Sequence, residues 1–225
     1  MNLLQTLFPN TMDKIPEFLE SIAETLQMTA VSGIVSFALG LVLGIVLTVT
    51  KRGGILENKV IYSVLDKCIN ILRSVPFVIL LTALMPFTRA IVGTAIGTKG
   101  AIIPLIVGTT PFFARQAEAA MAEVDPGLIE AAQSMGDGPG DLIFNIYLRE
   151  SIPALTRGAT ITLISLIGLT AMAGAVGGGG LGNFAVMWGH QRGQTDATYA
   201  ALIVILLMVF TVQAVGNFII RKTAH

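Results

Sequence analysis

Long apolar runs separated by short polar stretches dominate the chain. Met28 to Thr50 contains no charged residue, and Ala197 to Ile220 is equally apolar. Each run exceeds the about 20 residues that a helix needs to cross a hydrocarbon core of ~30 Å. Both runs are therefore predicted to be transmembrane helices.

Three further runs are predicted to span the membrane although their patterns are less pure. Ser74 to Thr88 is short, and Val60 to Arg73 is predicted to extend it backwards as an amphipathic helix. Gly100 to Ala114 is expected to continue to about Ala122, and Pro153 to Val176 carries a single charge near its start. The pattern predicts an all-α polytopic membrane protein with five transmembrane helices.

Charges and prolines inside these runs constrain their surroundings. Asp66, Arg73 and Arg115 must face a protein interior, a watery cavity or the interfacial zone, because lipid disfavours charge. The internal prolines free backbone carbonyls that a partner helix or water must satisfy. Two interpretations stay open, namely helix kinks in a packed bundle and a flexible lining of a pathway.

Basic residues are divided unevenly between the two sides of the membrane. One side holds Lys51, Arg52, Lys59, Arg115, Arg149, Arg157, Arg221 and Lys222, and the other holds Lys14, Arg89, Lys99 and Arg192. Cytoplasmic loops carry an excess of Lys and Arg. The first side is therefore predicted to be cytoplasmic, with the N-terminus outside and the C-terminus inside.

The first 25 residues are predicted to form a periplasmic or interfacial arm ahead of a transmembrane domain of residues 26–225. The arm carries an apolar stripe made of Ile15, Phe18, Leu19, Ile22 and Leu26. A stripe of this kind favours a helix that lies in the membrane interface. The alternative is that the arm leads directly into the first span.

Composition agrees with a membrane protein and excludes several functions. Of the 225 residues, 53% are hydrophobic and 12% are charged, whereas soluble domains average about 25% charged residues. A formal net charge of zero argues against nucleic acid as a partner. Cys68 is the only cysteine, and the sequence has no spacing typical of metal ligands and no nucleophile–base pattern. No catalytic, cofactor or metal site is predicted.

The chain also lacks a recognisable nucleotide-binding site. It contains no GxxxxGK[ST] motif. Gly177, Gly179 and Gly182 match GxGxxG only formally, because they lie in an apolar segment without a βαβ context. These glycines are expected to allow close helix approach or a tight re-entrant turn.

A polar, turn-rich island from Asp125 to Glu150 interrupts the apolar pattern on the predicted cytoplasmic side. Asp125 is predicted to cap a helix that starts at Pro126 and stops at Gly136. A second short helix is predicted to start at Asp141. The first helix carries an apolar stripe of Leu128, Ile129, Ala132 and Met135. So short a helix is marginal alone in water, so its stripe needs the membrane surface, its own bundle or another protein's groove.

The spacing within this island resembles a known family motif. The pattern consists of Glu130-Ala131-Ala132, then Gly136 after three residues, Ile146 after nine more, and Leu148 after one more. It resembles the EAA loop. That loop marks the membrane subunits of bacterial binding-protein-dependent ABC importers, and here it lies within a predicted coupling loop of residues 123–150. The family pattern usually ends in Leu-Pro, but this chain has Leu148-Arg149, so the next helix is expected to begin near Pro153.

Other strings are similar to the permeases of methionine importers. They are RSVPFVILL (73–81), MPFTRAIVGTAIG (85–97), VGTTPFFAR (107–115), ATITLISLIG (159–168) and AMAGAVGGGGLG (171–182). The resemblance implies a type I ABC importer permease fold in the inner membrane and transport of L-methionine. Transport of D-methionine as well stays open. It also implies a homodimer, two cytoplasmic ATPase subunits that bind ATP and Mg, and a methionine-binding lipoprotein outside.

Site residues follow from the motif and the resemblance together. The predicted ATPase-coupling residues are Leu128, Ile129, Glu130, Ala131, Ala132, Met135 and Gly136, where small side chains allow close contact and the glutamate can pair with a basic residue. Met172, a flexible side chain among small ones, is predicted to gate the pathway. Two alternatives stay open: a permease for another amino acid or small nutrient, and an ATP-independent secondary transporter.

Overall fold

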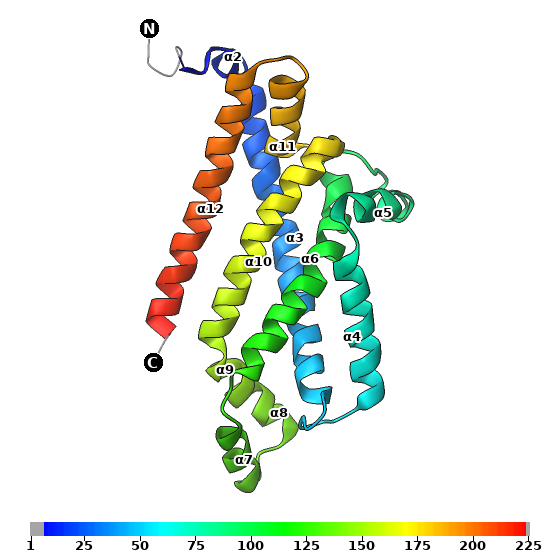
Figure 1. The fold of residues 1–225 in the computed structure, drawn as a ribbon, viewed down its shortest axis with the longest axis vertical. Helices are drawn as coiled ribbons and strands as arrows, with labels where there is room; N and C mark the ends of the chain where they lie inside the picture. The colour runs from blue at the N-terminus through cyan, green and yellow to red at the C-terminus, as the bar shows by residue number, and fades with distance from the viewer. Residues whose placement is uncertain (1–6, 224–225) are drawn as a thin grey trace. The chain divides into compact units, whose positions relative to one another are not determined.

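Helices make up all the regular structure of the part of the chain that the computed structural model describes, residues 7–223 (Figure 1). The long helices are α3 (Ile15–Thr50), α6 (Gly97–Ala122), α10 (Ile152–Ala173) and α12 (Thr195–Thr223), with α2 (Pro9–Met12), α4 (Lys59–Ser74) and α5 (Phe77–Val92) shorter. The predicted all-α fold is confirmed. The first residues of the predicted arm, before Leu7, lie outside the described part.

The chain forms two compact units. Unit 1 comprises the described residues up to Ile34 together with Val75–Gly108 and Leu163–Val212. Unit 2 comprises Val35–Ser74, Thr109–Thr162 and the described residues from Gln213 onwards. The chain passes from one unit to the other within α3, between α4 and α5, and within α6, α10 and α12. Each of the five predicted spans thus corresponds to one passage.

Length and composition identify fewer certain spans than the pattern predicts. Among residues 7–223, the stretches Ile15–Thr50, Ile152–Gly178 and Thr195–Thr223 are each long and apolar enough to cross a membrane. The helices α4 and α5 meet the same requirement only together, as a broken pair. The predicted count of five spans is compatible with these findings and stays a prediction.

The predicted continuous helix from Val60 to Thr88 is wrong. The helix α4 ends at Ser74, and α5 begins at Phe77 after an extended Pro76 with φ −57° and ψ 132°. Proline lacks an N–H group, and it pushes the residue before it out of the helical region. Val75-Pro76 therefore interrupts the helix, although the residues on both sides are apolar.

The arm continues directly into the first long helix. The helix α3 begins at Ile15 and runs without a break across the predicted boundary between residues 25 and 26. Phe18 and Ile22, from the predicted stripe, pack against a buried cluster that includes Leu181 and Phe184. The apolar stripe is thus partly covered by the chain's own residues in unit 1.

Candidate functional site

The island between α6 and α10 begins with the helix α7 (Pro126–Ser134). The carboxylate of Asp125 accepts a hydrogen bond of 2.8 Å from the Gly127 N–H, which caps the helix as predicted. Gly136 follows the helix with φ of 95°, a left-handed conformation that favours glycine. The predicted start and stop of this helix are confirmed.

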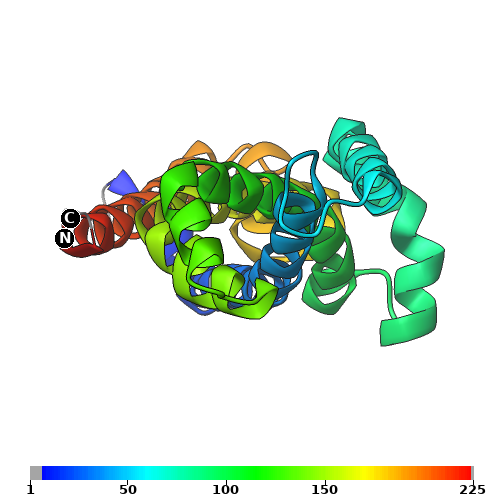
Figure 2. The same ribbon diagram turned by 90° about the horizontal axis from the view of Figure 1, so that it is seen from below.

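The second half of the island is also helical and runs almost directly into α10. It consists of α8 (Pro139–Asp141), the π-helical η1 (Leu142–Tyr147) and α9 (Leu148–Glu150). This half begins two residues before the predicted Asp141. The next helix, α10, begins at Ile152, one residue before the expected Pro153. Figure 2 shows the island, in green, in a view from below.

The apolar stripe of α7 is divided between the interior and the surface. Ala132 is buried, and Ile129 packs on a cluster that contains Met121 and Tyr147. Leu128 is 47% exposed and Met135 is 78% exposed. The chain's own unit therefore covers one part of the stripe and leaves the other part exposed, and the ATPase-coupling role of these residues stays a prediction. Ile129 and Ala132 pack against the interior of unit 2 and attach the island to it.

What remains exposed on α7 is a compact apolar surface. Leu128, Ala131 and Met135 are exposed at spacings of three and four residues, so they share one side of the helix. Phe144 of η1 is also exposed, by 69%. The sequence analysis did not select Phe144, because its π-helical surroundings have no recognisable sequence pattern. The name outer face is used below for the exposed apolar residues of the island, which are these three of α7 together with Phe144 of η1.

Glu130 lines a cleft beside this surface. The cleft has a volume of about 200 Å³ and is formed by Gly53, Gly54, Ile55, Pro126, Ile129, Glu130, Gln133 and Tyr147. The loop between α3 and α4 thus contributes one wall. Sequence reasoning missed this wall, although the adjacent basic pair Lys51-Arg52 and the paired glycines mark a turn on the predicted cytoplasmic side.

Tyr147 anchors the island from beneath. Its side chain is buried, and it packs in one cluster with Met121, Val124 and Ala117 of the preceding helix and its end. Burial raises the pKa of the Tyr147 phenol above its usual value, because the charged form would lose its hydration. The phenol is therefore neutral at physiological pH. The helix α7 packs, through Ile129, on a buried cluster that contains this uncharged side chain.

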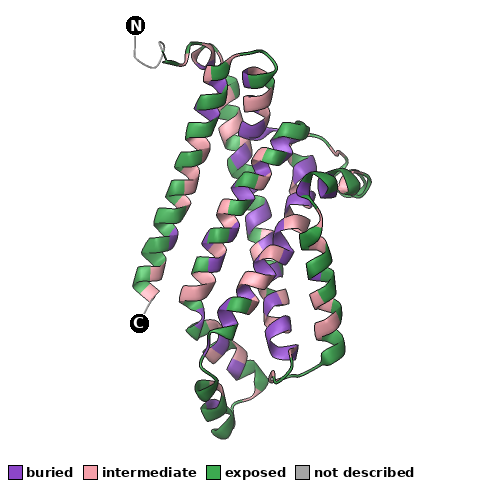
Figure 3. Cartoon of the chain, viewed as in Figure 1, coloured by how far each residue is buried: buried purple, intermediate pink, exposed green. Residues whose placement is uncertain are grey.

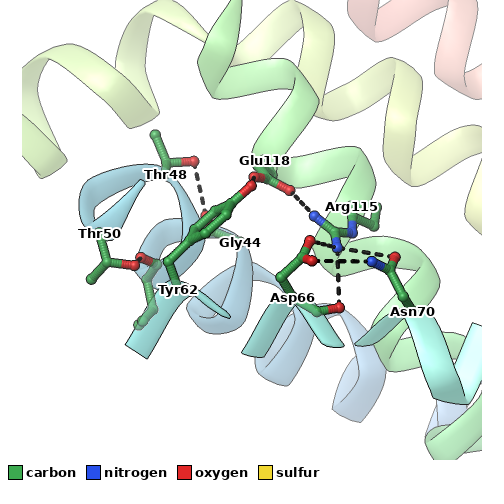
Figure 4. A network of polar contacts seen from close by, with 9 residues as sticks. Gly44, Thr48, Thr50, Tyr62, Asp66, Asn70, Arg115 and Glu118 are labelled. Atoms are coloured by element: carbon green, nitrogen blue, oxygen red, sulfur yellow. Dashed lines mark hydrogen bonds and ion pairs between the residues drawn. The ribbon is translucent and has the colours of Figure 1, made fainter. Parts of the chain in front are cut away.

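A network of polar side chains joins α4 to α6 within unit 2 (Figure 4). Arg115 donates to Glu118 at 2.7 Å and forms an ion pair with Asp66. Asn70 accepts from Arg115 at 3.0 Å, and Tyr62 donates to Glu118 at 3.4 Å. The structure therefore brings together Asp66 and Arg115, which were expected to avoid lipid, and pairs them with each other.

The predicted gate residue lies near the end of α10. Met172 is 43% exposed and shares one side of the helix with the exposed Ser165 and Gly168. Beyond it the helical path breaks at Val176 and Gly177, inside η2 (Gly174–Gly178). The structure thus puts Met172 beside a kink, on an exposed helix face that carries Ile161 as well as the small residues Ser165 and Gly168.

The glycine-rich segment after the kink forms a tight turn into α11 (Gly180–Phe184). Gly179 and Gly180 adopt φ of 79° and 72°. A side chain at Gly182 would collide with the carbonyl oxygen of Ala171. The predicted reason for these glycines, close approach and a tight turn, is confirmed.

Two side chains of α3 hold the start of α11. The carboxylate of Glu24 accepts from the Gly180 N–H at 2.6 Å. The hydroxyl of Thr25 accepts from the Leu181 N–H at 2.8 Å. Both bonds satisfy donors at a helix start that have no partner within the helix. Sequence reasoning missed this pair, because more than 150 residues separate each donor from its acceptor.

Known proteins resemble this chain along most of its length. The model of the family described as binding-protein-dependent transport system inner membrane component matches residues 22–225. A probable D-methionine transport system permease protein of Vibrio cholerae is 46% identical over 204 residues, covering 90% of each chain. The methionine import system permease protein of Bacillus subtilis is 43% identical over 217 residues, covering 96% of this chain and 97% of the relative.

Solved structures give the same relationship in three dimensions. A chain of the MetNI methionine ABC transporter in an inward-facing conformation superimposes with a TM-score of 0.92. It is 41% identical in sequence, and the match covers 95% of this chain and 99% of the other. A chain of an amino acid ABC transporter crystallised with histidines has a TM-score of 0.78 at 18% identity, which shows the shared fold alone.

Proposed function

Since the chain belongs to the family of binding-protein-dependent transport system inner membrane components, we propose that it is the permease subunit of an ATP-driven importer that carries methionine into the cytoplasm. The observation that carries this function is the match to relatives named as methionine transport permeases, at 46% and 43% identity over at least 90% of each chain. The chain has no phosphate-binding loop, so a separate ATPase subunit supplies the energy.

The island is the docking element for that ATPase. Its outer face consists of Leu128, Ala131, Met135 and Phe144, all of which are exposed. Glu130 stands at the cleft beside this face and offers a carboxylate to a basic side chain. One ATPase subunit binds each of two permease copies, and ATP and Mg are bound by the ATPases. The rigid packing beneath α7 passes movement of the docked helix to α6.

A second copy of the chain completes the pathway. The exposed face of α10 carries Ser165, Gly168 and Met172, and small residues allow helices in a membrane to approach closely. Met172 closes the pathway between the two copies, and its flexible side chain suits a plug that moves. A methionine-binding lipoprotein delivers the substrate from outside.

The two units support the predicted orientation. All eight basic residues assigned to the cytoplasmic side belong to unit 2, and all four assigned to the outer side belong to unit 1. The island, the α3–α4 loop and the end of α12 also belong to unit 2. In the proposed orientation the N-terminus is outside the inner membrane, and the C-terminus is in the cytoplasm.

Uptake into proteoliposomes tests this function. The permease is reconstituted with its ATPase and binding protein, and radiolabelled L-methionine is supplied outside with ATP inside. We expect ATP-dependent uptake that excess unlabelled D- or L-methionine reduces and other amino acids do not. A Glu130→Lys, Gly136→Trp variant is expected to lose most of the uptake. Uptake without ATPase, or full uptake by this variant, would contradict the proposed coupling.

A further inference from the structure

The helix α4 presents three different faces along its length. Tyr62, Leu65 and Ile69 pack against the chain's own helices. The exposed apolar face consists of Val60, Ile61, Val64, Cys68 and Ile71. The polar face consists of Ser63, Asp66, Lys67, Asn70, Arg73 and Ser74, all at the three- and four-residue spacing of one helix side. Much of α4 is exposed, as Figure 3 shows.

Contacts within unit 2 fix the level of α4 relative to the first span. Ile69 is buried in a cluster with Leu47 of α3 and Ala114 of α6, and Leu43 packs on the same cluster. Leu43 and Leu47 belong to the charge-free run that ends at Thr50. The middle of α4 is therefore level with membrane-embedded residues of α3.

Arg73 lies deeper still. Its guanidinium carbon is 5.9 Å from the centre of the Phe112 ring. The next residue, Phe113, packs on Phe37 with ring centres 4.6 Å apart. Phe37 is close to the middle of the charge-free run 28–50. The polar face of α4 therefore reaches from the cytoplasmic end of the span to about its centre.

Lipid cannot cover this face. Lys67, Asn70 and Arg73 are exposed on the single chain. A charged side chain at the centre of a bilayer is strongly disfavoured, and such residues face a protein interior or a water-filled cavity. The neighbouring apolar face, with Val64 and Ile71, is suited to lipid. The two exposed faces of α4 thus require two different surroundings.

The charge on the polar face is positive. The carboxylate of Asp66 is held by Arg115 and by the Asn70 side-chain amide (Figure 4). The guanidinium of Arg115 is shared between Asp66 and Glu118. Lys67 and Arg73 therefore provide the exposed charge, and both are cationic.

We infer that the polar face of α4 lines the water-filled translocation pathway, where Lys67 and Arg73 attract the carboxylate of the passing amino acid. This inference rests on the proposed transport function and adds to it the lining residues and the basis of attraction. The second copy closes the pathway around this face. The apolar face of the same helix remains in contact with lipid.

Thiol labelling separates the two exposed faces. Cys68 is the only cysteine of the chain and lies on the apolar face, so Cys68→Ser gives a background without thiols. Single cysteines replace Ser63 and Asn70 on the polar face, with Val64→Cys and Ile71→Cys as matched controls on the apolar face. Each variant is reconstituted as the complete complex and treated with a water-soluble methanethiosulfonate. Circular dichroism and complex assembly check that each variant is folded.

The polar-face cysteines are expected to react at least about tenfold faster than the controls, because the thiolate that reacts forms in water and not in lipid. An anionic sulfonate reagent should modify Asn70→Cys faster than a cationic trimethylammonium reagent. Adding Arg73→Gln should reduce that preference. Excess methionine should slow the labelling of Asn70→Cys and leave the controls unchanged.

Three results would overturn the inference. Equal, slow reaction of all four cysteines with the water-soluble reagent, alongside normal reaction with a membrane-permeant maleimide, would exclude a water-filled lining. Efficient disulfide formation between two Asn70→Cys copies without reagent access would make the face an interface between copies. Faster reaction with the cationic reagent would exclude attraction of a carboxylate. The labelling reaction does not depend on transport. Fast labelling of the polar face together with failed methionine uptake would therefore refute methionine as the substrate but leave the water-filled lining supported.

Discussion

At the scale of single residues, the hydroxyl of Thr25 is expected to stabilise the fold through its hydrogen bond with the Leu181 N–H. Thr25 and Leu181 are both buried, and the hydroxyl accepts the Leu181 N–H at 2.8 Å. Thr25→Val keeps the shape but leaves that N–H without a partner, which costs roughly 1–3 kcal/mol. A lower midpoint of thermal unfolding in detergent is expected, with most of the loss restored by Thr25→Ser.

Thr29 supplies the matched control, one helical turn further along α3. Its hydroxyl is buried and has no hydrogen-bond partner among the described residues. Thr29→Val removes a polar group without breaking a bond, so it should leave the midpoint unchanged or raise it slightly. An equal loss in Thr25→Val and Thr29→Val would show that the Leu181 bond contributes nothing specific.

At the scale of elements, local signals could be predicted from the sequence and non-local ones could not. The cap at Asp125 and the stop at Gly136 depend on neighbouring residues, and both were predicted correctly. The break at Pro76 also has a local cause, but the continuous apolar pattern around it led to the wrong prediction of one helix. The support of α11 by Glu24 depends on residues far apart in the sequence, so no sequence signal reveals it.

The island shows a second limit of sequence analysis. The pattern correctly predicts that Leu128, Ile129, Ala132 and Met135 lie within one arc of α7. It cannot predict which edge of that arc meets Tyr147, because the folding back of η1 determines this contact. The candidate docking surface is therefore narrower than the predicted stripe, and it gains Phe144.

Adjacent alanines of α7 should separate docking from folding. Ala132 is 2% exposed, whereas Ala131 is exposed. Ala132→Leu overpacks the interior and should destabilise the isolated permease by about 1–3 kcal/mol. Ala131→Leu should change that stability by less than about 0.5 kcal/mol, as surface substitutions do.

Ala131→Leu, which should hardly change the stability of the isolated permease, should weaken its binding to the ATPase. Its new side chain would stand on the outer face, where the proposed ATPase contact leaves no room, so co-purification of the ATPase should fall. Thermal unfolding of the permease alone and the yield of complex measure the two effects separately. A full yield of stable complex with Ala131→Leu would exclude the outer face as the docking surface.

At the scale of the whole molecule, the sequence predicts the orientation in the membrane from the distribution of basic residues. The excess of basic residues on one side is a property of the chain and the bilayer, and it needs no knowledge of packing. The two units keep the same division, with eight of these residues in unit 2 and four in unit 1. The proposed contacts with a second copy and an ATPase leave no signal in the distribution of charge, because their energies depend on surfaces that a single chain leaves exposed. Only the resemblance of residues 130–148 to the EAA loop pointed to the island.

The orientation can be measured on intact cells in the Cys68→Ser background. Gln191→Cys lies in an exposed loop of unit 1, and Leu56→Cys lies in the exposed α3–α4 loop of unit 2. If the basic side is cytoplasmic, a membrane-impermeant maleimide should modify Gln191→Cys at once and Leu56→Cys only after the cells are permeabilised. The reverse order would place the island outside, where no ATPase could dock on it, and would refute the proposed direction of coupling together with the orientation.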